Sequence, residues 1–265
     1  MPALIVRLYR FPVKGMTAEP AERVSVLAGG AVEGDRVLGF IRANVVDTPD
    51  RPSALGGWWG KRHFTALMVA PGVARLAARF DPDTHRLAIA LDGAALADGD
   101  VAVAGDRARL ADAVTRYVAG LGEPRLEPGD GYTLVGDGVT PRFHDRGPGH
   151  VTLVGAASVA ALAQALGAPV DERRFRMNVT LDGLAPWAEL EWIGRRVRIG
   201  AVEFDVTGPV VRCLATHANP EGGERDMDVM QTLTRVFGHA QPTMGVLAVP
   251  RAAGEIAVGD VVTVS

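Results

Sequence analysis

The chain has one cysteine, Cys213, in the segment GPVVRCLATHANP at residues 208–220. A lone cysteine is most often a small buried apolar residue. The adjacent Arg212 favours a different role, because a cation stabilises the thiolate, the form that binds soft metals or attacks an electrophile. His217 could pair with the thiol for nucleophilic catalysis, but no third group that would orient it is identifiable. Cys213 is therefore a candidate metal ligand.

Arginines cluster in two further segments, DERRFRMN at residues 171–178 and GRRVRIG at 194–200. In the second, Arg196 and Arg198 alternate with apolar residues, which is typical of the exposed face of a strand. The first does not alternate cleanly, and arginine is suited to clamp a phosphate through two hydrogen bonds. The first segment is therefore a candidate anion site, and we expect an exposed strand face in the second.

Other recognisable chemistry is absent from the sequence. It contains no GxGxxG after a strand, no GxxxxGK[ST], no HExxH, no CxxC and no GxSxG, and its six histidines lack the spacing of metal ligands. Of the 28 Lys and Arg residues only Lys14 and Lys61 are lysines, so these two are candidates for a functional role. A pyridoxal phosphate enzyme would need one of them as its Schiff base, but nothing else in the sequence supports that activity.

Composition predicts a cytoplasmic protein that binds no nucleic acid. The net charge is −3 over 265 residues, so no global basic surface is expected, and a single cysteine excludes an internal disulfide. Arg7 and Arg10 interrupt the N-terminal apolar run too early for a signal peptide. The uncharged stretch 151–170 is better interpreted as a short strand and a helix than as a membrane span.

The elements that must position these residues are mostly short strands. Apolar residues alternate at 4–8 and again at 197–206, where the parity changes at Gly200-Ala201, which predicts a two-residue hairpin turn. The C-terminal segments 246–249, 256–258 and 262–264 have the same pattern. Helical spacing predicts helices near 73–80, 114–121, 159–166 and 229–237. The fold class expected is mainly β with short helices (α+β).

The segment 120–149 is rich in Gly and Pro and has little periodicity, which indicates a linker or mobile flap. We therefore predict an N-terminal domain over residues 1–120 and a C-terminal domain over residues 121–265.

Several blocks, in order, carry a family resemblance: RFRMNVTLDG, PWAELEWIGRRVRIG, RCLATHANPEGGERDMDVMQTL, FGHAQPTMGVLA and GEIAVGD. Together they resemble the MOSC domain, the C-terminal domain of molybdenum cofactor sulfurases and their relatives. The N-terminal LYRFPVKGMTAEP and GAVEGDR are similar to the β-barrel domain that precedes MOSC in the amidoxime-reducing branch. The resemblance covers nearly the whole chain and implies a MOSC β-barrel preceded by a smaller N-terminal β-barrel-like domain.

The resemblance also implies a molybdenum–molybdopterin cofactor between the two domains. In similar proteins the cysteine of the RC block binds molybdenum, and it corresponds here to Cys213. The other positions that the resemblance assigns to the cofactor are Lys14, Arg36, Arg176, Asn178, Arg212 and Thr216. A thiolate suits molybdenum, and cations suit the phosphate of a pterin.

The chain also departs from the pattern of the amidoxime-reducing branch. Gly15 follows PVK where that branch usually has Ser, Met177 replaces a proline, and Val210 and Val211 stand where relatives often carry Cys or Ser. These changes remove small polar groups and concern the substrate more than cofactor binding. They are typical of a separate bacterial subfamily.

Three functions stay open at this point. The first is an oxidoreductase that reduces N-hydroxylated or related N–O substrates. With no iron–sulfur cysteines and no nucleotide motif, it would need electrons from a separate reductase. The second is a non-enzymatic carrier of the cofactor, or of sulfur on Cys213. The third is a family member that has kept the fold and lost the cofactor.

Overall fold

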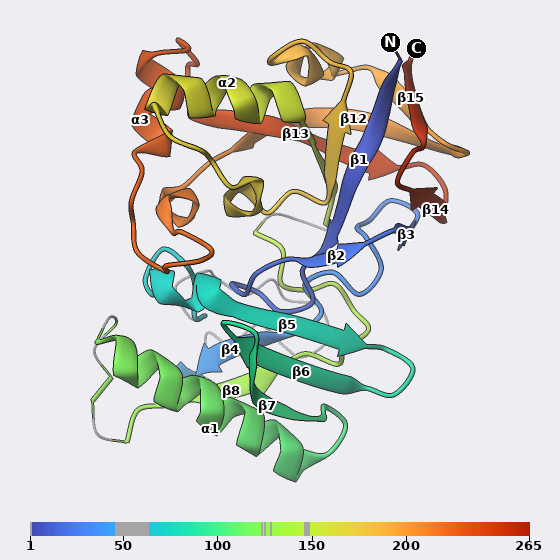
Figure 1. The fold of residues 1–265 in the computed structure, drawn as a ribbon. Coiled ribbons are helices and arrows are strands. Elements are labelled where there is room, and N and C mark those ends of the chain that lie inside the picture. The colour runs from blue at the N-terminus through green and yellow to red at the C-terminus, as the bar shows by residue number, and fades with distance from the viewer. Residues whose placement is uncertain (1, 46–63, 123, 125, 128, 146–148) are drawn as a thin grey trace.

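The protein has two lobes joined at a waist (Figure 1). The structure, a computed structural model, describes residues 2–45, 64–122, 124, 126–127, 129–145 and 149–265. The larger lobe contains both the N-terminal strand and the C-terminal strands, and the smaller one is built mainly from the first half of the chain. Within the described residues, no helix is both long and apolar enough to cross a lipid bilayer.

Seven strands of the described chain close the larger lobe into a barrel. The sheet order is β10-β9-β13-β12-β11-β15-β1, and β1 pairs with β10 to complete the ring. The β9–β10 pair is parallel, and the remaining pairs around the ring are antiparallel. The strands are β1 (Ala3–Arg10), β9 (Val151–Gly155), β10 (Val179–Asp182), β11 (Arg196–Ile199), β12 (Val202–Val211), β13 (Thr243–Pro250) and β15 (Val261–Val264).

Apolar side chains from alternate positions of these strands fill the barrel. Ile5, Leu153, Leu181, Phe204 and Val246 are all buried in one cluster, as the period of two along a strand requires. Short strands and two helices cover the outside. They are β2 (Glu19–Ala21), which extends beside β1, β3 (Arg23–Val26), which pairs with β14 (Gly254–Ala257), and the helices α2 (Ala156–Leu166) and α3 (Val229–Arg235).

The smaller lobe packs one long helix on antiparallel strands. Its core joins Phe40, Phe80, Leu87, Val114 and Leu134. The elements are β4 (Gly39–Arg42), β5 (Leu76–Asp81), β6 (Arg86–Leu91), β7 (Ala94–Asp100), α1 (Ala104–Leu121) and β8 (Tyr132–Val135). Short 3₁₀ helices connect elements in both lobes: η1 (Ala43–Val45), η3 (Pro71–Arg75), η4 (Glu172–Phe175), η5 (Ala188–Trp192) and η6 (Leu214–His217).

Most of the predicted elements are confirmed. The chain is mainly β with short helices, and the hairpin turn at Gly200-Ala201 joins β11 to β12. The uncharged stretch 151–170 forms β9 followed by α2. Arg196 and Arg198 are exposed on β11. The helices predicted near 114–121 and 229–237 correspond to α1 and α3.

The helix predicted near 73–80 is wrong. Residues 71–75 form η3, and the next six residues form strand β5, which pairs with β6 along its whole length. Leu76, Ala78 and Phe80 are buried while Arg79 is exposed, so burial follows a period of two. The apolar residues fitted both periods, and pairing with β6 decided between them.

The prediction of a linker or flap over 120–149 is also corrected in part. Strand β8 lies inside this segment and pairs with β4, and it buries Tyr132 and Leu134 in the core of the smaller lobe. Strand pairing therefore connects residues on the two sides of position 120. β8, which follows residue 120, pairs with β4 of the smaller lobe, and β1, which precedes it, pairs with β10 of the barrel. The division into residues 1–120 and 121–265 stays a prediction.

Candidate functional site

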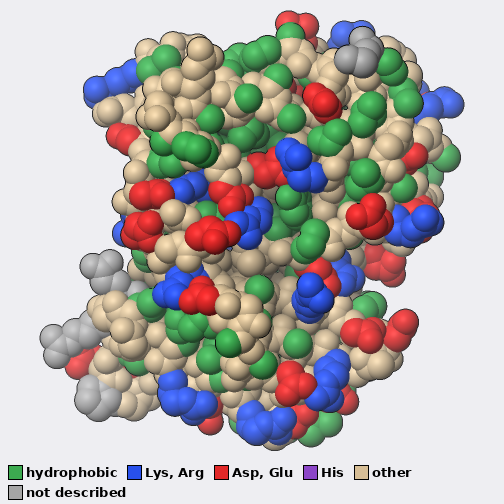
Figure 2. All heavy atoms as spheres, in the orientation of Figure 1, with side chains coloured by type: hydrophobic (Ala, Val, Ile, Leu, Met, Phe, Trp, Pro, Cys, Tyr) green, Lys and Arg blue, Asp and Glu red, His purple; other side chains and the backbone are tan. Residues whose placement is uncertain are grey.

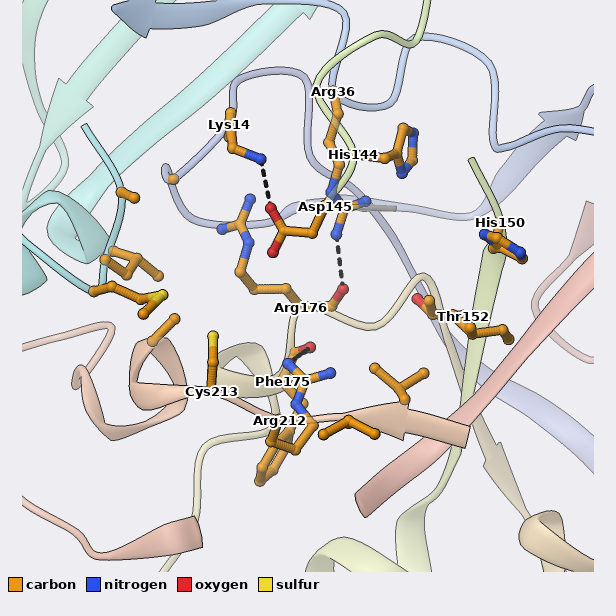
Figure 3. Close-up of a pocket in the computed structure, with 18 residues that line it drawn as sticks. Lys14, Arg36, His144, Asp145, His150, Thr152, Phe175, Arg176, Arg212 and Cys213 are labelled. Carbon is orange, nitrogen blue, oxygen red and sulfur yellow. Dashed lines mark hydrogen bonds and ion pairs between the residues drawn. The ribbon is translucent and has the colours of Figure 1, made fainter. Parts of the chain in front are cut away.

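A pocket of about 190 Å³ opens at the waist between the lobes (Figure 3). Its wall is assembled from the loop after β1, the loop before β4, the segment before η3, the segment before β9, the end of η4 and the end of β12. The residues that line it are Lys14, Gly15, Arg36, Ala66, Leu67, Met68, His144, Asp145, His150, Thr152, Phe175, Arg176, Val210, Val211, Arg212, Cys213, Ala215 and Leu247.

Five of the seven predicted site residues meet in this pocket. Lys14, Arg36, Arg176, Arg212 and Cys213 all line it, although they come from widely separated parts of the chain. Figure 3 shows the four cationic side chains and the thiol around a common space. Lys61, the other lysine considered as a functional candidate, lies outside the described residues.

Asn178 and Thr216 lie behind the pocket wall. Asn178 is fully buried and accepts hydrogen bonds from the backbone N–H of Thr152 at 3.2 Å and from its hydroxyl at 2.9 Å. Its amide also donates to the carbonyl of Tyr9 at 3.2 Å, so it connects β9, β10 and β1. The hydroxyl of Thr216 donates to the carbonyl of Cys213 at 3.0 Å. Both residues hold the backbone that carries the pocket residues, and their predicted contact with a cofactor stays a prediction.

Lys14 is buried, with 7% of its surface exposed. Its ammonium donates to the carbonyl of Phe143 at 2.7 Å and to Oδ1 of Asp145 at 2.6 Å. Burial lowers the pKa of Lys14, and the charge of Asp145 opposes that shift. The amine of Lys14 is thus desolvated, and the carboxylate of Asp145 beside it favours its charged form.

Arg36 and Arg176 share an unusual backbone conformation. Their φ angles are 54° and 53°, in the left-handed region that non-glycine residues seldom occupy. Both guanidinium groups lie over the ring of Phe11, at 4.9 and 4.5 Å from its centroid. Arg36 pairs with the buried carboxylate of Asp35 and donates to the carbonyl of Arg176 at 3.1 Å. Such strained residues concentrate at functional sites.

The charge of Arg176 persists despite its surroundings. Burial, with the nearby charge of Arg36, lowers the pKa of Arg176 to about 9, so the side chain remains cationic at neutral pH. Its guanidinium donates to the carbonyl of Met16. The other arginines of the DERRFRMN segment turn away from the pocket. Arg173 pairs with Asp171 and Glu221, and Arg174 pairs with Asp226.

Arg212 and Cys213 follow the end of β12. The backbone N–H of Arg212 donates to the carbonyl of Pro242 at 2.7 Å, and its side chain donates to the carbonyl of Phe175 at 2.7 Å. Burial lowers the pKa of Arg212 to about 10, and the neighbouring Cys213 opposes that shift. Within the described part of the chain, Nε of Arg212 is buried without a hydrogen-bond partner. Cys213 is partly exposed and precedes η6.

Sequence reasoning missed three ionisable pocket residues, His144, Asp145 and His150. His144 and Asp145 fall in the segment interpreted as a linker, where no periodicity indicated a buried position, and His150 follows that segment directly. His144 is 7% exposed, and its Nε2 lies 3.7 Å from Oδ2 of Asp35. Burial, aided by the charge of Arg36, lowers the pKa of His144 to about 3, so it is neutral at pH 7. The sequence FHD within a Gly- and Pro-rich loop was the available signal.

The structure explains the glycine at position 15. Its φ is +89°, and a Cβ placed there would lie 2.4 Å from the carbonyl oxygen of Thr65. A serine would therefore force this backbone to move.

Val210 and Val211 line the pocket as apolar residues. The wall of the pocket is therefore apolar at these two positions before Arg212.

Charged side chains of both signs gather along the waist, as Figure 2 shows for one face. The cationic pocket is therefore not part of a broad basic surface there, which agrees with the net charge of −3.

The match to a family model falls on the part of the chain that contains most of the residues lining the pocket. Residues 141–263 match the family model described as the MOSC domain. A molybdenum cofactor sulfurase of Drosophila grimshawi is 40% identical over 86 residues, 32% of this chain and 11% of that protein. One of Anopheles gambiae is 38% identical over 76 residues, 29% of this chain and 9% of that protein. The chain thus spans about a tenth of the length of these curated relatives.

Two solved structures are also similar. The YuaD protein from Bacillus subtilis matches with a TM-score of 0.45 and 13% identity, over 100% of this chain and 96% of that one. YiiM from Geobacillus stearothermophilus matches with a TM-score of 0.32 and 16% identity, over 43% of this chain and 53% of that one. The family match therefore indicates that residues 141–263 of this chain are similar to the MOSC domain.

Proposed function

We propose that this protein binds a molybdenum–molybdopterin cofactor in the pocket at the waist, with the thiolate of Cys213 as a metal ligand. One observation carries the proposal. The single cysteine of the chain and four cationic side chains converge on one pocket, although Lys14 and Cys213 are far apart in the sequence. Two relatives that match part of this chain are named molybdenum cofactor sulfurases.

The residues present fit such a group. A soft thiolate suits molybdenum, and buried arginines suit the phosphate of a pterin because they present paired donors. The buried Nε of Arg212, unpartnered among the described residues, is a donor that an anionic ligand could satisfy. Lys14, Arg36, Arg176 and Arg212 would hold the anionic part, and Cys213 the metal.

The activity that we propose is an oxidoreductase acting on N-hydroxylated or related N–O compounds. The bound cofactor would supply two-electron redox chemistry, and the chain supplies binding and orientation. Thr216 holds the backbone of Cys213 through its hydroxyl and its N–H, at 3.0 and 3.1 Å from the carbonyl oxygen of Cys213. Electrons would come from a separate reductase, because the sequence has no cysteine set for an iron–sulfur cluster.

Metal analysis tests the cofactor proposal directly. The chain and its Cys213→Ala variant are expressed in a host that makes the cofactor, with Val236→Ala, a change at an exposed position, as the control. We expect near-stoichiometric molybdenum in the wild type and in the control, and its loss from Cys213→Ala. Absence of molybdenum from all three folded proteins would overturn the proposal.

A carrier function is the second candidate, and the names of the relatives favour it. The same pocket could store and pass on the cofactor, or Cys213 could carry sulfur as a persulfide. Reductive turnover of an N-hydroxylated probe with an artificial electron donor would identify an enzyme. Transfer of the cofactor to an apo-enzyme without turnover, or an extra sulfur atom on Cys213 by mass spectrometry, would identify a carrier.

A further inference from the structure

Arg174 is buried behind the wall of the pocket, with 3% of its surface exposed, and it is not among the residues that line the pocket. Its guanidinium pairs with both carboxylate oxygens of Asp226, with Nη2 2.7 Å from Oδ2 and Nη1 2.7 Å from Oδ1. Nη1 also donates to the carbonyl of His217 at 3.0 Å. Paired bonds of this kind fix the orientation of the two groups. Arg174 therefore joins η4 rigidly to a segment that lies 43 to 52 residues later in the chain.

Both partners of this arginine belong to residues 214–226, the cysteine loop, which begins directly after Cys213. The loop turns back on itself where the backbone N–H of Asn219 donates to the carbonyl of Glu224 at 2.8 Å. The side-chain amide of Asn219 donates to Oδ2 of Asp226 at 2.8 Å. The carboxylate that pairs with the arginine therefore also holds this turn, and the buried pair fastens the loop as a whole.

The short helix η4 also holds the chain on the other side of Cys213. The side chain of Arg212 donates to the carbonyl of Phe175 at 2.7 Å, and its guanidinium lies 6.0 Å from the centroid of that ring. Phe175 is fully buried and follows Arg174 directly. The backbone is thus attached to η4 at Arg212, before the cysteine, and at His217, after it. These two attachments set the direction in which the thiol enters the pocket (Figure 3).

The cysteine loop also contacts the smaller lobe. The side chain of Arg225 donates to the carbonyl of Met68 at 2.7 Å, and Met68 lines the pocket. Gly223 lies close to η3, since a Cβ placed there would be 2.8 Å from the Cα of Gly72. A displaced loop would therefore disturb both the thiol and the part of the pocket wall that the smaller lobe supplies.

Arg173, one residue earlier, joins the same two segments in a weaker way. It pairs with Glu221 of the cysteine loop, but the two side chains are 30% and 76% exposed. An exposed ion pair contributes little, because water screens it and competes with it. In the pair of Arg174 with Asp226 the side chains are only 2% and 26% exposed. Of these two neighbouring arginines, Arg174 is therefore the one that can fix the loop.

We propose that Arg174 is a positioning residue. It holds Cys213 in the direction from which the thiol binds its ligand, and it acts through the cysteine loop without touching that ligand. The inference rests on the proposed function, which assigns the metal to Cys213. Removal of a residue that orients a metal ligand typically lowers metal affinity about 10- to 100-fold.

Two substitutions of Arg174 and one of Arg173 test this role in the full chain. Arg174→Met keeps an unbranched apolar stem and removes every donor, and Asp226 is exposed enough to turn towards water. Arg174→Lys keeps the charge but cannot make the paired bonds, and it serves if Arg174→Met does not fold. Arg173→Met is the matched control, because it removes the exposed pair at the neighbouring position.

The first measurement uses protein without molybdenum. Amide hydrogen exchange in the cysteine loop should be about tenfold faster in Arg174→Met than in the wild type, because the loop opens locally. Alkylation of Cys213 by iodoacetamide at pH 7 should also become faster. Arg174→Lys should lie between these two proteins, and Arg173→Met should match the wild type. Exchange in β12 and β13 should stay unchanged in every variant, which separates displacement of the loop from loss of the fold.

The second measurement is the molybdenum retained after dialysis by protein from a host that makes the cofactor. Retention should correspond to at least about a tenfold loss of affinity in Arg174→Met, with partial recovery in Arg174→Lys and no loss in Arg173→Met. The recovery by lysine distinguishes positioning of the thiol from a general loss of stability, since all the proteins compared keep the folded barrel.

Wild-type exchange and alkylation in Arg174→Met would overturn the inference. Faster exchange with unchanged retention of molybdenum would overturn it too, because the loop could then move without effect on the ligand. Equal losses in Arg173→Met and Arg174→Met would show that burial of the pair is irrelevant. A wild type without molybdenum, in which exchange and alkylation still depend on Arg174, would refute only the proposed cofactor.

Discussion

At the scale of single residues, the pocket is held together by polar groups that are buried in unusual states. His144 is neutral at pH 7 beside Asp35, and Lys14 is almost inaccessible to solvent, so that burial lowers its pKa. Arg36 and Arg176 adopt left-handed backbone conformations. These features cost stability, so the surrounding fold must impose them, and each one gives a measurable consequence.

Burial of neutral His144 makes stability depend on pH. Its pKa is about 3 in the folded protein, against 6.5 for an ordinary histidine, so only the unfolded state binds a proton between these values. The free energy of unfolding should fall as the pH drops from 6.5 towards 3, by up to about 1.4 kcal/mol per pH unit from this residue. His144→Gln should make the free energy of unfolding, measured by denaturant titration at each pH, depend less on pH. The exposed variant His85→Asn should leave it unchanged, and parallel curves for wild type and His144→Gln would contradict the burial of a neutral ring.

Gly15 should tolerate no side chain. Its positive φ and the 2.4 Å approach to the carbonyl of Thr65 act together, so Gly15→Ala should lower the free energy of unfolding by about 3 kcal/mol or more. Gly29→Ala isolates the effect of φ, because Gly29 has φ +63° and no neighbour within 4 Å of the added atom. Gly29→Ala should lower the free energy of unfolding by only about 1 kcal/mol. Equal losses for the two variants would show that the contact with Thr65 is not restrictive.

At the scale of elements, β5 shows how tertiary pairing selects between two periodicities. The strand buries Leu76, Ala78 and Phe80 against the smaller lobe, whereas a helix through Val73, Leu76 and Phe80 would turn Ala78 away from the core. The substitution of one residue therefore distinguishes the two structures.

Ala78→Glu should destabilise the protein by more than about 3 kcal/mol, because Ala78 is only 2% exposed and the carboxylate would be buried without a partner. Arg79→Glu, at the exposed neighbouring position, should change stability little. Thermal unfolding of both variants measures the difference. If Ala78→Glu unfolded at the wild-type temperature, residues 76–81 could not be a buried strand.

At the scale of the whole molecule, the first strand and the last strand complete one barrel. β1 pairs with both β10 and β15, and it contributes the buried Ile5 and Leu8. Figure 1 shows the two termini side by side. The C-terminal barrel therefore depends on residues that lie before the predicted boundary at 120.

A fragment of residues 121–265 should not unfold cooperatively, because the missing strand leaves the edges of β10 and β15 unpaired. Joining residues 1–10 to Ser265 through a short Gly/Ser linker should restore a cooperative transition, since the termini are neighbours. Circular dichroism during heating measures both proteins. A cooperative transition in the fragment without β1 would show that residues 121–265 form an independent domain.

The sequence by itself determined the features that local patterns encode. Alternation fixed the hairpin between β11 and β12, and β9 followed by α2 could be predicted because strand and helix periods differ clearly there. The MOSC blocks indicated the pocket residues Arg176, Arg212 and Cys213 before their positions were known. The N-terminal blocks LYRFPVKGMTAEP and GAVEGDR indicated Lys14 and Arg36.

Only the tertiary structure decided which polar groups share the pocket. Asp145 and Lys14 are 131 residues apart, and no local period relates them. Asn178 and Arg176 are two residues apart, yet the left-handed turn at Arg176 sends one side chain to the pocket wall and the other into the hydrogen bonds between strands. The physical reason is the same in both cases. Burial and pairing depend on contacts between distant segments, and those contacts exist only after the barrel has closed on β1.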